Sequence, residues 1–150
     1  MPSLNIPVGY FDIQPDETVH IEGYWVKSFA LPRQEWLKKL ATVPASLSSA
    51  YKNFSSMSSA ELAKITGLSE AGATLANQRD FSEPLYWIGS DSQLQELAVF
   101  FKDQHIDLVV GGCFVHLSTG FCKGRALNWL TKAYQREVGK QLTTIGLGDS

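Results

Sequence analysis

The spacing of apolar residues predicts two amphipathic helices in the second half of the chain. The first has Asp91 as its N-cap and carries apolar side chains at every third or fourth position up to Phe101. The second begins at Lys123 and ends at Gly139, because glycine commonly terminates a helix. The apolar positions are Leu94, Leu97, Ala98 and Phe101 in the first helix, and Leu127, Leu130, Tyr134 and Val138 in the second.

Proline and serine residues mark shorter helices in the first half of the chain. Pro32 stands at a favoured first helical position, and Pro44 separates this helix from the next one. Ser58 and Glu61 form a capping box, and Ser69 caps the helix that follows. The predicted helical segments are 32–41, 44–51, 59–67 and 70–78.

Runs of β-branched and aromatic residues predict five strands. They cover residues 21–30, 84–88, 107–110, 113–117 and 143–147. Gly111 and Gly112 predict a hairpin between the third and fourth strands. The first twenty residues are rich in turn formers and predict no regular element. Helices mixed with antiparallel hairpins predict an α+β fold.

The composition argues against several classes of function. The formal net charge is −2 and the pI is near 5.9, which disfavours binding to nucleic acid or to an anionic membrane surface. No apolar run approaches 18 residues and the N-terminus lacks a signal-peptide pattern, so we expect a cytoplasmic protein. Cys113 lies in an apolar run and is interpreted as a small buried side chain rather than a nucleophile.

The last residues carry candidate chemistry. The predicted strand 143–147 runs into Gly148-Asp149-Ser150, so Asp149 stands at a strand end, where α/β proteins place ligands. A carboxylate there suits a hard cation, and Lys123 at a helix start suits an anion. The alternative is a solvated lysine and a helix-capping aspartate at a frayed terminus.

Four short segments carry a resemblance to a known family. They are Gly9-Tyr10-Phe11, residues 60–67, residues 79–83, and Lys123-Gly124-x-Ala126 followed by Gly148-Asp149-Ser150. In this order and spacing they resemble the mannosyl-3-phosphoglycerate phosphatases of the haloacid dehalogenase (HAD) superfamily. The similarity extends from about Asn5 to the last residue.

The resemblance implies an architecture and a set of site residues. Residues 1–121 would form an α+β cap domain of the C2B type, and residues 122–150 would be the remnant of the hydrolase core. Lys123 would be the remnant phosphate-binding lysine, and Asp149 a weak remnant ligand for the family's Mg²⁺. The residues implied in substrate binding are Arg79, Ser82, Glu83 and His116.

Physical chemistry leaves alternatives open for these substrate residues. Arg79 can hold a carboxylate or phosphate with two hydrogen bonds, while Ser82 and Glu83 bond hydroxyl groups. Alternatively, Arg79 and Glu83 form a surface ion pair. His116 lies on a predicted strand and is either a ligand-binding residue or a hydrogen-bonded structural one.

One feature of the family is missing from the sequence. The superfamily attacks phosphate with the first Asp of an Asp-x-Asp-Gly-Thr motif, and none of the seven aspartates here stands in that motif. Without this nucleophile we expect a truncated phosphatase, inactive alone, which retains affinity for a phosphorylated sugar or glycerate. We expect it to bind Mg²⁺ only weakly, because one carboxylate makes a poor site.

Two other functions remain open. In one, the chain is a self-associating structural module, since a helix built to cover a sheet would expose Ala126, Leu127, Leu130 and Tyr134. We therefore expect a homodimer, with the terminal helix and strand exchanged or packed against the partner. Alternatively, a separate chain supplies the nucleophile and completes an active enzyme.

Overall fold

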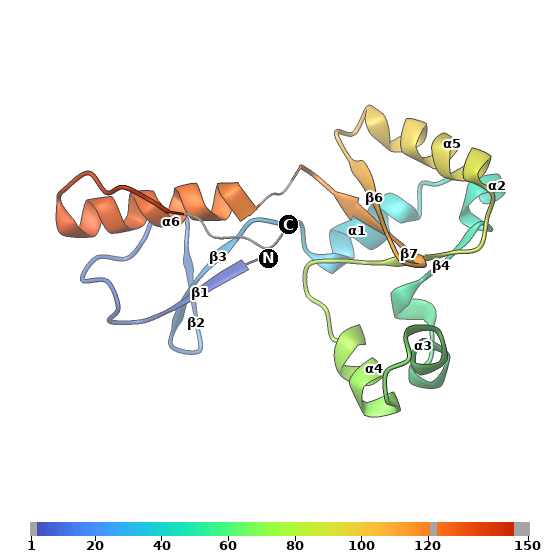
Figure 1. The fold of residues 1–150 in the computed structure, drawn as a ribbon, viewed down its shortest axis with the longest axis horizontal. Coiled ribbons are helices and arrows are strands. Elements are labelled where there is room, and N and C mark those ends of the chain that lie inside the picture. The colour runs from blue at the N-terminus through green and yellow to red at the C-terminus, as the bar shows by residue number, and fades with distance from the viewer. Residues whose placement is uncertain (1–2, 121–122, 146–150) are drawn as a thin grey trace. The chain divides into compact units, whose positions relative to one another are not determined.

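The structure, a computed structural model, describes residues 3–120 and 123–145 (Figure 1). The chain divides into two compact units. We call residues 1–29 together with 121–150 the terminal unit, and residues 30–120 the central unit. We predicted one division, at residue 121, whereas the first 29 residues group with the C-terminal segment. Asp149 and Cys122 lie outside the described residues.

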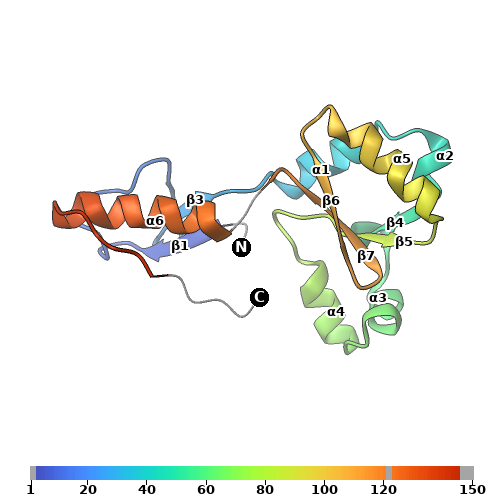
Figure 2. The same cartoon turned by 45° about the horizontal axis from the view of Figure 1, so that its top comes forward.

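The terminal unit contains a three-stranded antiparallel sheet and one long helix. The strands are β1 (Ser3–Pro7), β2 (Val19–Ile21) and β3 (Tyr24–Ser28), in the order β1-β3-β2. Helix α6 (Lys123–Val138) runs alongside this sheet in Figures 1 and 2. The prediction of turns alone in the first twenty residues was wrong, because β1 and β2 form there. The predicted strand 21–30 is divided by a turn at Glu22–Gly23, where both residues have positive φ.

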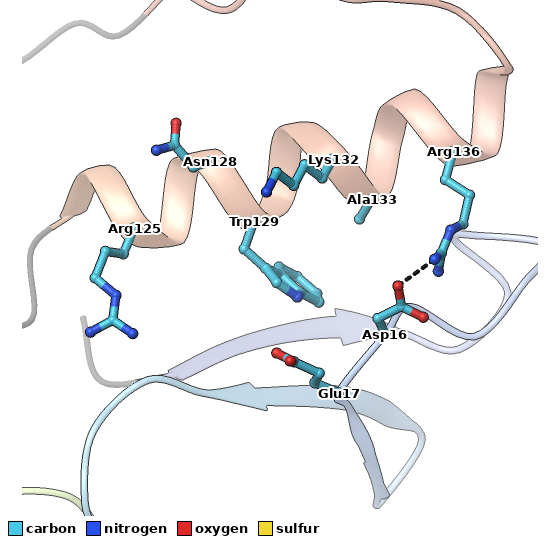
Figure 3. A pocket seen from close by; sticks show the side chains of 8 residues that line it. All are labelled: Asp16, Glu17, Arg125, Asn128, Trp129, Lys132, Ala133 and Arg136. Atoms are coloured by element: carbon cyan, nitrogen blue, oxygen red, sulfur yellow. Dashed lines mark ion pairs between the residues drawn. The ribbon is translucent and has the colours of Figure 1, made fainter.

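Aromatic contacts hold α6 against the rest of the terminal unit. The rings of Phe11 and Tyr134 lie 5.0 Å apart, and those of Phe29 and Trp129 lie 6.0 Å apart, both edge to face. Arg136 at the end of α6 forms an ion pair with Asp16 (Figure 3). The helix ends as predicted, with Gly139 at φ +64°.

The central unit carries a four-stranded antiparallel sheet and five α-helices. The strand order is β4-β5-β7-β6, so β4 and β6 are the two edges. The predicted α+β class is thus confirmed. The strands are β4 (Tyr51–Asn53), β5 (Leu85–Trp87), β6 (Asp107–Gly111) and β7 (Phe114–Ser118). The helices are α1 (Arg33–Leu40), α2 (Ala45–Ser48), α3 (Ser59–Thr66), α4 (Glu70–Asn77) and α5 (Asp91–Lys102), with a 3₁₀ turn η1 at Phe54–Ser56.

Local capping signals fix the N-terminal ends of α3, α4 and α5 in the central unit. The predicted capping box of Ser58 and Glu61 is confirmed, and α3 ends at Gly67 in the left-handed conformation. Helix α5 is capped by Ser90, which forms a box with Gln93, so the prediction of Asp91 as the cap was wrong. The predicted helix 44–51 was too long, because it ends at Ser48 and Tyr51 pairs with Trp87 in the sheet.

Alternate residues of the central strands feed two apolar clusters on opposite sheet faces. Leu85 and Val115 belong to the larger cluster with α1, α2 and α5, whereas Tyr86 and Phe114 pack against the smaller one with α3 and α4. His116 follows Phe114 by two positions, so it shares the face of the smaller cluster. The larger cluster comprises Trp36, Leu40, Val43, Leu47, Tyr51, Leu85, Leu97, Phe101, Ile106 and Val115.

Two predictions about single segments need correction. Cys113 is exposed, because it lies in the turn that joins β6 to β7 rather than inside a strand. Residues 143–145 have no regular secondary structure, so the predicted strand does not form there, and its last two residues lie outside the described part. Within the described ranges, no helix is both long and apolar enough to cross a bilayer.

Candidate functional site

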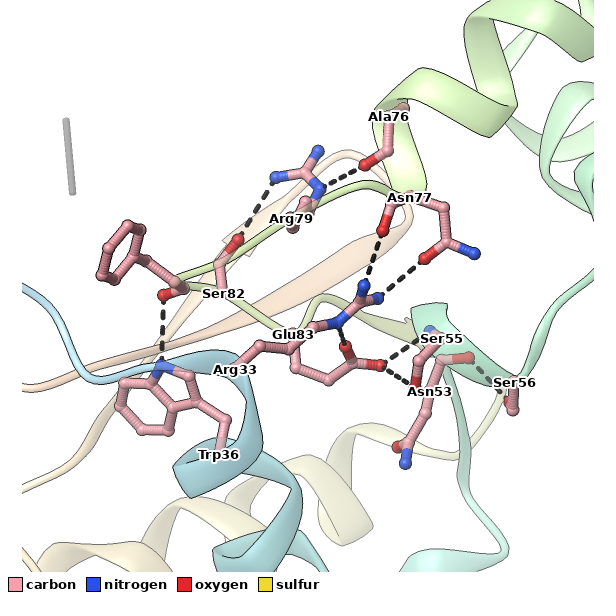
Figure 4. A network of polar contacts seen from close by, with 11 residues as sticks. Arg33, Trp36, Asn53, Ser55, Ser56, Ala76, Asn77, Arg79, Ser82 and Glu83 are labelled. Carbon is pink, nitrogen blue, oxygen red and sulfur yellow. Dashed lines mark hydrogen bonds and ion pairs between the residues drawn. The ribbon is translucent and has the colours of Figure 1, made fainter. Parts of the chain in front are cut away.

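The four residues predicted to bind substrate all lie in the central unit. Arg79, Ser82 and Glu83 belong to the segment between α4 and β5 (Figure 4). His116 lies on β7. The segment is fixed at its start by α4 and at its end by β5, which pairs with β7. The pairing of β5 with β7 therefore brings the segment 79–83 close to His116.

Glu83 has a buried carboxylate whose two oxygens are both bonded. Oε2 forms an ion pair with Nε of Arg33, and Oε1 accepts hydrogen bonds from the Ser55 amide and hydroxyl, both at 2.8 Å. The Glu83 side chain is 0% exposed, and a buried charge needs such partners to be tolerated. The predicted alternative of a surface pair between Arg79 and Glu83 is wrong, because the partner of Glu83 is Arg33.

Arg33 connects the start of α1 to the stretch from Asn77 to Glu83, which lies 44 to 50 residues further along the chain. Besides Glu83, it donates from Nη1 to the Asn77 carbonyl at 2.6 Å and from Nη2 to the Asn77 side chain at 2.7 Å. The Arg33 amide donates to the Asp80 carbonyl at 2.7 Å, and the Trp36 indole donates to the Phe81 carbonyl at 3.2 Å. The start of α1 therefore sets the backbone path that presents Arg79 and Ser82.

Arg79 is held in place by contacts on two sides. Its Nε donates to the Ala76 carbonyl at 2.8 Å, and Nη1 donates to the Ser82 hydroxyl at 3.4 Å. The guanidinium lies 5.2 Å from the centre of the Phe54 ring, at cation–π distance. Nη2 has no hydrogen-bond partner among residues 3–120 and 123–145, so it remains available to an anion.

His116 is close enough to Arg79 to feel its charge. Partial burial, followed by the positive charge of Arg79, lowers the pKa of His116 from its ordinary value. Burial, followed by repulsion from Arg33, also lowers the pKa of Arg79, which Glu83 partly offsets. At neutral pH His116 is therefore an uncharged imidazole with one donor and one acceptor. We call Arg79, Ser82 and His116 the Arg79–His116 cluster.

A hollow of about 310 Å³ in the central unit is lined by polar side chains. Arg33 and Ser55, which hold Glu83, belong to its wall. Ser59 and Thr74 join α3 to α4 there through a hydroxyl–hydroxyl bond of 2.8 Å. Such groups can donate to and accept from the hydroxyls of a polyol. The lining residues of this polar hollow are Arg33, Ser55, Ser59, Thr74, Asn77 and Gln78.

Sequence reasoning missed Arg33 and the polar hollow. Arg33 lies 50 residues from Glu83, and no local pattern indicates that pair. The only available signal for the hollow was the density of serines around positions 55–59, which we interpreted as helix caps.

The residues predicted for phosphate and metal chemistry lie in the other unit. Lys123 is the first residue of α6 and is exposed, and Asp149 lies outside the described residues. In residues 3–120 and 123–145, no group of three His, Cys, Asp or Glu side chains is arranged to hold a metal ion. Weak binding of Mg²⁺ by this chain stays a prediction, because Asp149 is not among the described residues.

The Arg79–His116 cluster is equipped to recognise a ligand rather than to attack one. A guanidinium and a neutral imidazole can bind an anionic group and a neighbouring hydroxyl. The Ser82 hydroxyl accepts from Arg79, and a guanidinium cannot remove its proton, so this contact does not activate Ser82 as a nucleophile.

Comparison with known proteins adds a relative. A glucosyl-3-phosphoglycerate/mannosyl-3-phosphoglycerate phosphatase of Persephonella marina is 34% identical to the chain over 100 residues. The matched stretch is 66% of the chain and 37% of that relative, so the chain spans little more than a third of the relative's length. No family model matches the chain. The chain is thus a distant homologue of this phosphatase, which agrees with the resemblance in its short segments.

Proposed function

We propose that the central unit binds the phosphorylated sugar or glycerate substrate of a HAD-type phosphatase, and that these 150 residues do not hydrolyse it unaided. The observation that carries this proposal is the Arg79–His116 cluster, which pairs a fixed cation with a neutral imidazole. The activity for which the relative is named supports a ligand with sugar and glycerate parts. The HAD cap assignment for the central unit is part of this proposal.

The ligand's charged and uncharged parts would engage different groups. Nη2 of Arg79 would donate to a carboxylate or phosphate oxygen, and His116 would bond the same anion or an adjacent hydroxyl. The polar hollow would take sugar hydroxyls with its serine, threonine and amide groups. The Arg33–Glu83–Ser55 contacts would keep these groups in position before binding, which lowers the entropic cost of association.

Hydrolysis would need groups that the sequence does not contain. The Asp-x-Asp-Gly-Thr nucleophile motif is absent, so an attacking carboxylate would have to come from outside these 150 residues. Lys123 would keep a remnant role in phosphate binding, and Asp149 a weak one toward Mg²⁺. A separate nucleophile-bearing chain that completes the enzyme remains part of this proposal.

Calorimetric titration with glucosyl-3-phosphoglycerate and 3-phosphoglycerate tests the binding site. We expect saturable binding, a loss of about tenfold or more in Arg79→Ala, and partial recovery in Arg79→Lys. Lys64→Ala, which removes an exposed charge from α3, is the matched control and should leave affinity unchanged. Equal affinity in Arg79→Ala and the unaltered chain would disprove the assignment.

A second candidate function is self-association through the terminal unit. All three residues of the edge strand β2 are exposed, and Val19 and Ile21 are at least half exposed. Such an edge invites pairing with another strand. The predicted helix face is only partly available, because Ala126 is buried and Leu127 is 38% exposed. Tyr10, Ile13 and Tyr24 extend the exposed apolar surface of this unit.

Sedimentation velocity tests this second candidate. At tens of micromolar we expect a dimer, and Ile21→Lys should convert it to a monomer by placing a charge on the edge strand. Val99→Lys, on an exposed apolar position of α5 in the central unit, is the matched control. A monomer for the unaltered chain at that concentration would count against self-association.

A further inference from the structure

The terminal unit contains a cleft of about 450 Å³ that the proposed function does not use. It lies between α6 and the turn that leads into β2 (Figure 3). A volume of this size is within the range of small-molecule sites. We call it the α6 cleft. Its lining residues are Asp16, Glu17, Arg125, Asn128, Trp129, Lys132, Ala133 and Arg136.

The two carboxylates of the α6 cleft are already neutralised. Asp16 forms an ion pair with Arg136, and Glu17 forms one with Lys27 of β3. The hydrogen bond from Arg136 lowers the pKa of Asp16, so that carboxylate stays ionised and keeps its partner. Neither carboxylate is therefore left to neutralise the other cations of the cleft.

Arg125 and Lys132 are the remaining cations. Both are exposed, and neither has an ion-pair partner in the part of the chain that the structure describes. Seven residues of helix separate them, which is two turns and about 10 Å along the axis. Trp129 lies between them on the same face, because positions i, i+4 and i+7 share one side of a helix.

Trp129 supplies a flat apolar surface between these charges. Figure 3 shows its indole directed from α6 toward the strands. The ring is half-buried, and its contact with Phe29 is edge to face, which holds the indole in a defined orientation. A base or the apolar face of a sugar can stack on such a ring.

The α6 cleft is separate from the predicted phosphate lysine. Lys123 precedes Arg125 by two residues, which is a rotation of about 200° around the helix axis. Lys123 also does not belong to the lining of the cleft. A ligand in the cleft therefore does not depend on the role proposed for Lys123, nor on the Arg79–His116 cluster in the other unit.

We propose that the α6 cleft binds a small ring compound that carries two phosphate groups, either a nucleoside diphosphate or a sugar bisphosphate. Its phosphates would pair with Arg125 and Lys132, and its ring would lie against the indole of Trp129. Both ligands carry a ring and two phosphates, and they differ in the type of ring and in the spacing of the phosphates, which are adjacent in a nucleoside diphosphate and separate in a sugar bisphosphate. The ion pair of Arg136 with Asp16 closes one end of the cleft, and breaking it would release a third cation.

An NMR titration of the full chain tests the proposal. The probes are ADP, fructose 1,6-bisphosphate, uncharged adenosine and inorganic phosphate, and the readout is the indole N–H resonance of Trp129, assigned with Trp129→Phe. We expect ADP, fructose 1,6-bisphosphate or both to shift this resonance saturably, and to bind more tightly than adenosine or inorganic phosphate. A response to ADP alone indicates a nucleotide, and a response to the bisphosphate alone indicates a sugar.

Three variants on exposed positions separate this site from general charge attraction. Arg125→Ala and Lys132→Ala should each weaken binding about tenfold. Asp16→Asn should tighten it several-fold, because Arg136 then becomes free to bind phosphate. Lys64→Ala on α3 removes the same charge from the central unit and should change nothing.

Clear outcomes would overturn the proposal. One is the absence of any Trp129 shift with either ADP or fructose 1,6-bisphosphate up to millimolar concentration. Another is affinity that survives the double substitution of Arg125 and Lys132. A third is inorganic phosphate that binds as tightly as ADP and fructose 1,6-bisphosphate. If Arg79→Ala abolishes binding and Arg125→Ala does not affect it, the ligand binds in the central unit and not in the α6 cleft.

Discussion

The two units each contain an arginine–carboxylate pair, and the pairs differ in their surroundings. Arg33 and Glu83 are almost enclosed, with side chains 16% and 0% exposed, whereas Arg136 and Asp16 are 50% and 62% exposed. The buried pair also bonds Ser55 and Asn77, so it ties three segments together. The buried pair therefore stabilises the shape of the site, whereas the exposed pair is free to exchange partners.

Breaking the buried pair should have the largest effect on stability. Glu83→Ala leaves the Arg33 charge partly buried without its partner, and we expect a loss of about 3–5 kcal/mol in the free energy of unfolding. Urea denaturation measures it. Glu35→Ala, which removes an exposed partner of Lys38, is the matched control and should have little effect. A loss in Glu83→Ala no larger than in this control would contradict the comparison.

Removing one partner of Glu83 should cost less than removing Glu83 itself. Ser55→Ala deletes the hydroxyl bond at 2.8 Å and keeps the amide bond to the same oxygen. We expect a loss of about 1–3 kcal/mol, since hydrogen bonds to charged groups lie in that range. Ser48→Ala, whose hydroxyl is exposed, is the control in the same denaturation experiment. Equal values for the two variants would show that Ser55 does not support Glu83.

His116 should make the stability of the central unit depend on pH. Its pKa is lowered in the folded state by burial and by Arg79, so the unfolded chain binds the proton more readily. The contribution of the neutral imidazole to folding stability is fully present above the unfolded-state pKa of about 6.5. It is lost as the pH falls through the lower pKa that His116 has in the folded state. Denaturation midpoints between pH 7.5 and 5 measure it, and His116→Gln should flatten this dependence. If the denaturation midpoint of His116→Gln depends on pH as strongly as that of the unaltered chain, other groups cause the acid sensitivity.

The exposed pair should have the smallest effect, and salt should remove it. Asp16→Asn leaves Arg136 in water, where its charge remains solvated, so little stability is lost. The Debye length falls to about 3 Å at 1 M salt, and the small difference from the unaltered chain should then vanish. Denaturation at low and high salt checks this. If the loss of stability in Asp16→Asn persists at 1 M salt, the Arg136–Asp16 pair is shielded from solvent ions like the buried Arg33–Glu83 pair.

Elements governed by local chemistry could be predicted from the sequence. Ser58, Gly67 and Ser69 act through hydrogen bonds and backbone angles within a few residues, so α3 and α4 appear where they were expected. The pattern of α5 and α6 is similarly local. The exact start of α5 was not predictable, because Ser90 and Asp91 are both favourable N-cap residues. In the structure Ser90 is the N-cap.

Features that depend on distant residues could not be predicted in this way. Tyr51 follows a helix and becomes a strand residue because it pairs with Trp87. The strand β1 contains Pro7 and is defined by its pairing with β3. Arg33 and Glu83 meet across 50 residues, and the proximity of Arg79 to His116 depends on the sheet order. The residues of the site could be recognised in the sequence, whereas the contacts between them depend on the fold.

The most direct test of the proposed binding site is the pKa of His116 with and without ligand. An NMR titration of its imidazole in the presence of saturating 3-phosphoglycerate reports whether an anion sits beside it. We predict that the pKa rises on binding, because a nearby negative charge favours the protonated ring, and that affinity therefore increases as the pH falls. A pKa of His116 that stays the same when the ligand is bound would contradict the assignment of this cluster as the substrate site.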